Sequence, residues 1–187
     1  GGKDSLALIA LLAAYRRFCP APFTLQAICL KIGDPFDWEI IKAFCEERDV
    51  PFTLVEENLL PILELEKSPC SLCARLRRGV LLQKAEELGC NKLALGHHRD
   101  DVMETYLMSM VFEGRFYAMR PKRQMEKDNI SVIRPLIDVK EGSIAALSNR
   151  LQFPVVKNPC PVDGRTKRQE MKETLRALES RFPGALD

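Results

Sequence analysis

The stretch Asn-Lys-Leu-Ala-Leu-Gly-His-His-Arg-Asp-Asp, residues 91–101, passes from a short apolar segment through one glycine into a polar run. Residues 91–95 predict a strand and residues 99–112 predict a helix, so Gly96 falls at a strand-to-helix junction. Junctions of this kind are typical of βαβ crossovers, the units from which parallel sheets are built.

The same alternation continues on both sides of this stretch. Strands are predicted at 25–30, 51–55 and 130–134, and helices at 4–17, 36–48, 72–88, 141–151 and 166–182. Short strands that alternate with helices predict an α/β fold with a mainly parallel sheet flanked by helices. No repeat or shift in composition divides the chain, so residues 1–187 are expected to form a single domain, with 124–129 as its most exposed loop. Ligands of such sheets bind at the carboxyl ends of the strands.

Composition narrows the class of protein. A hydrophobic content of 46% and a charged content of 29% are ordinary for a globular chain, and a net charge of +2 does not by itself indicate a nucleic-acid partner. The apolar run 6–14 is too short to span a bilayer, and the preceding residues 1–5 are a poor start for a signal peptide, so a buried helix is favoured over export. Seven cysteines, an odd number, favour a reducing cytoplasm over a disulfide scaffold. No membrane partner is expected.

The chain opens with Gly1-Gly2-Lys3-Asp4-Ser5 directly before a predicted helix. Glycines let backbone N–H groups approach an anion, and the helix N-terminus and Lys3 add positive charge, so this segment could hold phosphate. Its spacing is not that of the Walker A loop. The residues alone are equally consistent with a capped helix in which Asp4 and Ser5 are the capping residues.

Three cysteines stand in distinctive surroundings. Cys70 and Cys73 are three residues apart at the start of a predicted helix, and Cys160 lies between two prolines. The pair could bind zinc, hold part of an iron–sulphur cluster or act as a redox dithiol, and Cys160 could be a buried structural residue. Three cysteines can also hold three irons of a [4Fe–4S] cluster and leave the fourth iron open.

Charged residues gather at several further points of the sequence. Asp100 and Asp101 are carboxylates of the kind that Mg²⁺ prefers, although two acidic residues at a helix start are also typical N-terminal caps. Adjacent histidines such as His97 and His98 seldom bind one zinc ion. Basic residues form three groups, which could be solvated faces or could contact RNA: Arg75, Arg77 and Arg78; Arg115, Arg120, Lys122 and Arg123; and Arg165, Lys167 and Arg168.

Taken together, these motifs resemble a known family. Residues 1–5 resemble the PP-loop, S-G-G-K-D-S, of ATP pyrophosphatases without its first Ser. The string C-S-L-C-A-R-L-R-R-G at 70–79 and the string L-G-H-H-R-D-D at 95–101 resemble those of the tRNA 2-thiocytidine synthetases. The resemblance continues in the same order through residues 104–105, 114–115, 119–122, 133–136, 153–154 and Cys160.

The resemblance implies the PP-loop ATPase fold of the adenine nucleotide alpha hydrolase-like class, in an N-terminally truncated form whose first strand is missing. It implies an ATP-dependent tRNA sulfurtransferase that adenylates C2 of an anticodon-loop cytidine and replaces its oxygen with sulphur. Its partners would be tRNA and a sulphur donor such as a cysteine desulfurase, and a homodimer is one option.

The resemblance also assigns residues to roles. ATP would be bound by Gly1, Gly2, Lys3, Asp4, Ser5, His97 and Arg99, with Lys3, Asp4 and Asp101 catalytic and Asp101 near Mg²⁺. A [4Fe–4S] cluster would be held by Cys70, Cys73 and Cys160, and tRNA would contact Arg75, Arg77, Arg78, Arg120, Lys122, Lys167 and Arg168. Asp163 stands where many members have a further cysteine, and one hypothesis places it near the open iron.

Three alternatives remain at this point. The chain could be a tRNA 2-thiouridine synthetase or another PP-loop ligase. It could be a zinc-stabilised RNA-binding module without catalysis. It could also be a redox protein with a reversible Cys70–Cys73 disulfide, although that function would leave Cys160 and residues 1–5 unexplained.

Overall fold

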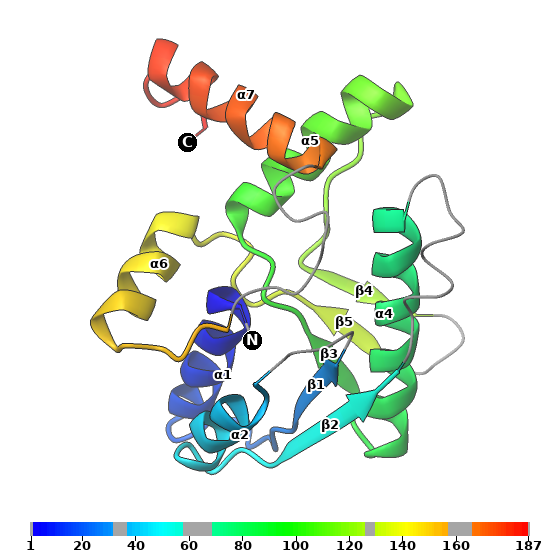
Figure 1. Cartoon of the computed structure of the whole chain (residues 1–187), viewed down its shortest axis with the longest axis vertical. Helices are drawn as coiled ribbons and strands as arrows, with labels where there is room; N and C mark the ends of the chain where they lie inside the picture. Colours follow the sequence, from blue (N-terminus) through cyan, green and yellow to red (C-terminus); the bar gives the residue numbers. More distant parts are fainter. Residues whose placement is uncertain (1, 32–36, 58–68, 126–129, 157–165, 187) are drawn as a thin grey trace.

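The computed structural model describes residues 2–31, 37–57, 69–125, 130–156 and 166–186, including all their side chains except those of residues 69 and 70. Its helices lie around centrally placed strands, which confirms the predicted α/β fold (Figure 1). Residues 126–129 of the predicted exposed loop, as well as Cys160 and Asp163, lie outside the described ranges.

Two groups of strands form the sheet structure. β1 (Ala27–Lys31) pairs in parallel with β2 (Phe52–Glu56), and β3 (Lys92–Ala94) pairs in parallel with β5 (Ser131–Ile133). β4 (Lys122–Gln124) joins β5 in the antiparallel direction. The sequence did not predict β4, because its exposed Lys-Arg-Gln lacks the apolar alternation that indicates a strand.

The helices lie close to their predicted positions. They are α1 (Lys3–Tyr15), α2 (Glu39–Glu46), α4 (Pro69–Glu87), α5 (Arg99–Glu113), α6 (Glu141–Arg150) and α7 (Lys167–Arg181). α2 begins three residues later than predicted, and α4 begins three residues earlier. Proline is favoured in the first helical turn, because its missing N–H would have no partner there. The two cysteines of the C-x-x-C motif therefore lie within the first five residues of α4.

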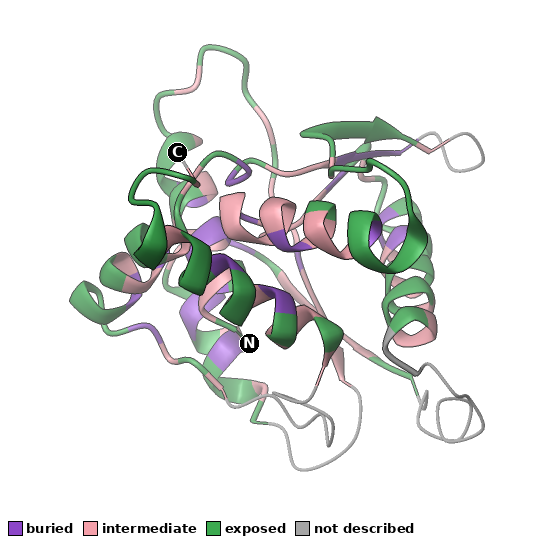
Figure 2. Cartoon of the chain, turned by 90° about the horizontal axis from the view of Figure 1, so that it is seen from above, coloured by how far each residue is buried: buried purple, intermediate pink, exposed green. Residues whose placement is uncertain are grey.

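Two apolar clusters cover opposite sides of the strands. In one, Leu6 and Leu8 of α1 pack with residues of α2 and α6, and Ala27 of β1 joins them. In the other, Leu82 of α4 packs with residues of β3 and β5, and Ile28 of β1 joins that cluster. Successive strand residues point to opposite faces, so the sheet is covered on both sides (Figure 2).

The apolar run 6–14 is thus part of a buried helix, as predicted. In the part of the chain that the structure describes, no helix has the length and apolar character needed to cross a membrane. The remaining helices position the site: α7 packs along α5, and α6 packs beside α1 (Figure 1).

Candidate active site

A polar cavity of about 340 Å³ lies where the first turns of α1, α5, α6 and α7 converge. Two of its side chains, from α1, were predicted to bind or process ATP, and Asp101 of α5 was predicted to be catalytic. The residues that line it are Lys3, Asp4, His98, Asp101, Glu104, Glu141, Thr166, Arg168, Gln169 and Lys172. This cavity is the candidate site.

The start of α1 is left open toward ligands. Its N-cap residue is Gly2, which is exposed, and no side chain caps the helix among the described residues. The interpretation of Asp4 and Ser5 as capping residues is therefore wrong, because the cap position falls on a glycine two residues earlier. Backbone N–H groups in an uncovered first turn are suited to bind an anion.

The β3–α5 turn lies directly against this helix start. A Cβ atom on Gly96 would lie 2.9 Å from the carbonyl oxygen of Asp4 and 3.2 Å from the backbone nitrogen of Ser5. Any side chain at Gly96 would have to push these backbone atoms apart. The glycine thus lets the two motifs, far apart in sequence, share one site.

A capping box fixes the first turn of α5. The Nδ1 atom of the buried His98 accepts a hydrogen bond from the Asp101 N–H at 3.4 Å, and the Asp101 carboxylate accepts one from the His98 N–H at 3.0 Å. The capping interpretation therefore holds for Asp101. The second oxygen of its carboxylate stays directed at the cavity wall, where Arg168 donates to it at 2.8 Å.

The adjacent Asp100 has a different task. Its carboxylate accepts a hydrogen bond from the Glu141 N–H at 2.7 Å, so it satisfies the N-terminus of α6. Only Asp101 of the two lines the cavity, which supports the choice of Asp101 over Asp100 as the catalytic carboxylate.

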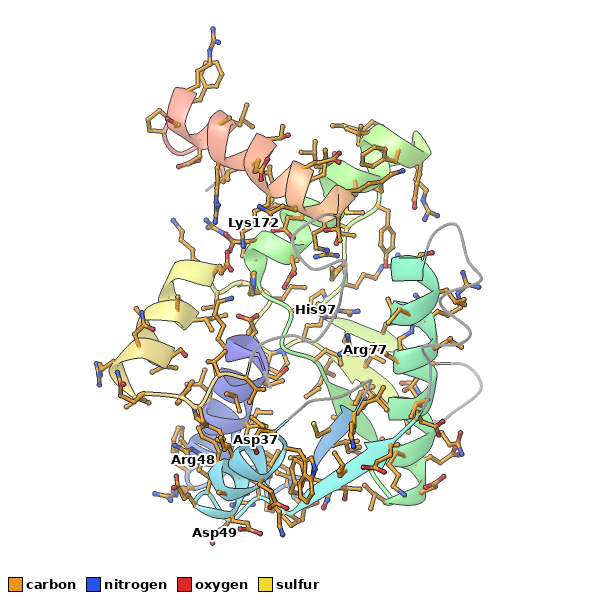
Figure 3. The ribbon with its side chains drawn as sticks, viewed as in Figure 1. Asp37, Arg48, Asp49, Arg77, His97 and Lys172 are labelled. Atoms are coloured by element: carbon orange, nitrogen blue, oxygen red, sulfur yellow. The ribbon has the colours of Figure 1, made fainter. Side chains whose placement is uncertain are left out.

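Glu141 stands between two lysines. Its carboxylate lies 3.0 Å from the Nζ of Lys3 and 2.7 Å from the Nζ of Lys172, which lies between α7 and the start of α6 (Figure 3). Burial alone raises the pKa of Glu141, but the hydrogen bonds and charges of the two lysines outweigh it and lower that pKa to about 2. Burial alone lowers the pKa of Lys3. The hydrogen bonds and charges of Glu141 and Asp4 outweigh burial and raise that pKa above its ordinary value. The Lys3 side chain therefore stays protonated and the Glu141 carboxylate stays ionised at neutral pH.

Asp4 and Asp101 are two of the carboxylates that line the cavity, and carboxylate oxygens are ligands that Mg²⁺ prefers. The Oδ1 atom of Asp4 is buried and accepts no well-formed hydrogen bond, although the Nζ of Lys3 lies 3.0 Å from it. The described residues contain no group of three or more histidine, cysteine, aspartate or glutamate side chains that could hold a metal ion by themselves. An ion here would complete its shell with water and phosphate oxygens, as Mg²⁺ usually does.

His97 and Arg99, both predicted to bind ATP, do not line the cavity. The Nδ1 atom of His97 accepts a hydrogen bond from Arg134 at 3.2 Å, and burial, together with the charge of Arg134, lowers its pKa against the opposing effect of Asp101. His97 is therefore neutral at pH 7. The histidine that lines the cavity is His98. Its place directly before the predicted helix was the only feature of the sequence that could have indicated this role.

Arg168 was predicted to contact RNA, and in the structure it lies against acidic side chains of α5. It donates to Asp101, to Glu104 at 3.2 Å and to the hydroxyl of Thr105 at 3.2 Å. Burial raises the pKa of Glu104, and Arg168 opposes this effect. The sequence could not indicate these contacts, because they depend on α7 packing against α5.

The proposed cluster ligands are described only in part. Cys73 is a half-buried free thiol and the fifth residue of α4, while the Cys70 side chain lies outside the described residues. Arg75, Arg77 and Arg78 follow on the same helix and are exposed. Figure 3 shows Arg77 on the side of α4 turned toward the strands. Burial raises the pKa of the Cys29 thiol of β1, and the charge of Arg77 opposes this effect.

The fold and the site together are those of an α/β domain with a polar cavity at the start of its first helix. Residues 1–178 match the model of the PP-loop domain, and the chain belongs to that family. It is 40% identical over 195 residues to a tRNA-cytidine(32) 2-sulfurtransferase of Janthinobacterium sp. (strain Marseille), and 39% identical over 193 residues to one of Neisseria meningitidis serogroup A. These alignments cover all of this chain and 61% and 60% of the relatives, so the chain spans about three fifths of their length.

A solved structure is also similar. The U34-tRNA thiolase NcsA from Methanococcus maripaludis with its [4Fe-4S] cluster superposes with a TM-score of 0.82 at 29% sequence identity. The match covers 100% of this chain and 66% of that one.

Proposed function

We propose that this chain carries the catalytic domain of an ATP-dependent tRNA sulfurtransferase that converts an anticodon-loop cytidine to 2-thiocytidine. The observation that carries the proposal is the cavity in which Lys3, Asp4 and Asp101 converge beside the open start of α1. The names of the relatives, which are tRNA-cytidine(32) 2-sulfurtransferases, support the choice of substrate and product.

The cavity suits the activation of a base oxygen by ATP. The N–H groups at the start of α1 and the Lys3 ammonium would bind the pyrophosphate part of ATP. Mg²⁺ held near Asp4 and Asp101 would neutralise charge on the phosphate oxygens. The C2 oxygen of cytidine attacks the α-phosphorus, and pyrophosphate leaves with the bonding electrons. The base then carries AMP as a leaving group at C2.

The second half of the reaction needs a sulphur nucleophile at C2. Cys70, Cys73 and Cys160 would hold a [4Fe–4S] cluster, which when bound would present sulphide from the sulphur donor to C2, and thiolates are the usual ligands of such clusters. Two of these cysteines lie within the first five residues of α4, near the helix N-terminus, which stabilises thiolates. The cluster in the solved relative supports this assignment.

The RNA would approach over the basic helix α4 and strand β4. Arg75, Arg78, Arg120, Lys122 and Lys167 are all exposed, so they can contact phosphates. An anticodon-loop base is already unpaired and can enter a pocket without first breaking a duplex. We expect in addition a sulphur donor such as a cysteine desulfurase, a cytoplasmic location and a homodimer as one assembly.

One second candidate function is favoured by a specific observation. The solved relative is a thiolase of U34 in tRNA, which places 2-thiouridine synthesis beside 2-thiocytidine synthesis. Both reactions would use the same cavity and cysteines, and they differ in the base that is presented.

The test is anaerobic purification followed by reaction with unmodified tRNA, ATP, Mg²⁺ and sulphide. Iron, sulphide and zinc are quantified in the protein, and the nucleosides of the digested tRNA are identified by mass spectrometry. We expect about four irons per chain and ATP-dependent 2-thiocytidine. A product of 2-thiouridine would select the second candidate, and bound zinc without iron or thiolation would instead indicate a non-catalytic RNA-binding module.

A further inference from the structure

Two lysines from opposite ends of the chain share one carboxylate in the cavity. Lys3 begins α1, Lys172 lies on α7, and Glu141 begins α6. One Glu141 oxygen accepts hydrogen bonds from Lys3 at 3.0 Å and from Lys172 at 2.9 Å, and the other lies 2.7 Å from Lys172. Figure 3 shows Lys172 turned from α7 toward this meeting point.

The three side chains are largely withdrawn from solvent. Their exposed fractions are 29% for Lys3, 21% for Glu141 and 25% for Lys172. Ion pairs this far from bulk water interact more strongly than pairs on the surface. Two ammonium groups on a single carboxylate leave one positive charge that Glu141 does not balance.

The remaining charged side chains of the cavity lie in two groups, one beside Lys3 and one around Arg168. Asp4 lies beside Lys3, while Asp101 and Glu104 share Arg168. Among these seven groups, four carboxylates face three cations, so together they carry a net charge of −1 when all are ionised. A divalent cation near Asp4 and Asp101 reverses this sign and makes the lysine side attractive to an anion.

We propose that Lys172 is a second lysine of the pyrophosphate site and that the Glu141 carboxylate occupies the place of a phosphate until ATP arrives. This inference rests on the proposed function and extends it from α1 to α7. The ammonium group of a lysine sits on a flexible four-carbon stem, so Lys3 and Lys172 can turn from Glu141 to a phosphate oxygen without a backbone movement. Binding of the phosphates then links the two ends of the chain.

The experiment uses inorganic pyrophosphate with Mg²⁺ as the ligand and titration calorimetry as the measurement, with the whole chain. Lys172→Gln removes the charge and keeps the first two methylenes of the stem, and Lys172→Arg keeps the charge. We expect Lys172→Gln to weaken binding at least tenfold and Lys172→Arg to stay within about threefold of the wild type. Glu141→Gln removes the competing anion, so it is expected to bind pyrophosphate at least threefold more tightly.

Matched controls come from an ion pair outside the cavity. Lys84 and Glu87 pair at 2.9 Å on α4, and Lys84→Gln and Glu87→Gln are expected to leave pyrophosphate binding unchanged. Thermal unfolding of each variant shows that it is folded.

The outcomes separate this inference from the proposed function. Wild-type affinity in Lys172→Gln, or weaker binding in Glu141→Gln, would overturn the role of the lysine pair while the ATP site stands. Failure of the wild-type protein to bind Mg²⁺ and pyrophosphate at millimolar concentration would contradict the proposed function itself.

Discussion

At the scale of single residues, adjacent positions perform different tasks. By residue type and position, Asp100 and Asp101 both fit a helix cap or a metal ligand, and only the family resemblance favoured Asp101. In the structure, Asp100 satisfies the N-terminus of α6 and Asp101 faces the cavity. The direction of each side chain follows from its position on the helical turn. The geometry of α5 alone therefore distinguishes the two aspartates.

This difference predicts a large loss of activity for one of two isosteric substitutions and almost no change for the other. Asp101→Asn removes a charge from the cavity and is expected to lower tRNA-dependent pyrophosphate release about a hundredfold or more. Asp100→Asn keeps an oxygen that can accept the Glu141 N–H, so its rate should stay within about threefold of the wild type. Equal losses in both variants, measured by a coupled pyrophosphate assay, would contradict the assignment of Asp101.

Gly96 supplies a second residue-scale prediction. Gly96→Ala places a methyl group against the backbone of Asp4, so it is expected to cost about 1–3 kcal/mol of the free energy of unfolding and to weaken pyrophosphate binding. Gly79→Ala is the matched control. Gly79 lies within α4 with nothing within 4 Å of an added Cβ, and alanine there should stabilise by about 0.5–1 kcal/mol. Urea denaturation measures both, and a neutral Gly96→Ala would show that the turn does not need glycine.

At the scale of elements, apolar periodicity predicted every described helix and four of the five strands. It works for α1 and β1 because their apolar residues are buried against neighbours. It fails for β4, whose polar residues are held by pairing with β5 alone. It also cannot predict which helices meet, so Glu104, Glu141 and Lys172 were not recognised as site residues.

A buried hydroxyl lies at the end of α5. The Oγ atom of Ser109 lies within hydrogen-bond distance of the carbonyl oxygens of Tyr106, Arg115 and Tyr117, to one of which its single O–H donates, and it accepts from the Tyr117 N–H at 3.1 Å. The chain turns away at Gly114, whose φ of 63° favours glycine. Ser109 therefore attaches the segment leading to β4 to the body of α5.

We expect Ser109→Ala to leave these backbone groups without their partner and to cost about 1–3 kcal/mol of the free energy of unfolding. Hydrogen exchange at residues 115–117 should accelerate more than exchange in α1. The exposed Ser143 of α6 provides the control, since Ser143→Ala should change neither quantity appreciably. Unchanged protection at 115–117 in Ser109→Ala would show that the hydroxyl does not hold this segment.

At the scale of the whole molecule, Glu141 joins α1, α6 and α7, and its titration should be visible in the stability of the fold. Its pKa is about 2 in the folded protein, below the ordinary value of 4.5. A depressed pKa contributes stability that is complete above about pH 4.5 and is lost as the pH falls toward 2. Between pH 5 and pH 3 the wild type should therefore lose more free energy of unfolding than Glu141→Gln, as measured by urea denaturation. Identical pH profiles would mean that the two lysines do not hold this carboxylate.

The central claim is that the C2 oxygen of a tRNA cytidine attacks the α-phosphorus of ATP in this cavity. If it does, that oxygen leaves the base as part of AMP when sulphur replaces it. The reaction is run in H₂¹⁸O, and the AMP is weighed by mass spectrometry beside the 2-thiocytidine formed. We predict unlabelled AMP in equal amount to 2-thiocytidine. AMP that carries ¹⁸O would show that water, rather than the base, attacks ATP, and it would contradict the account.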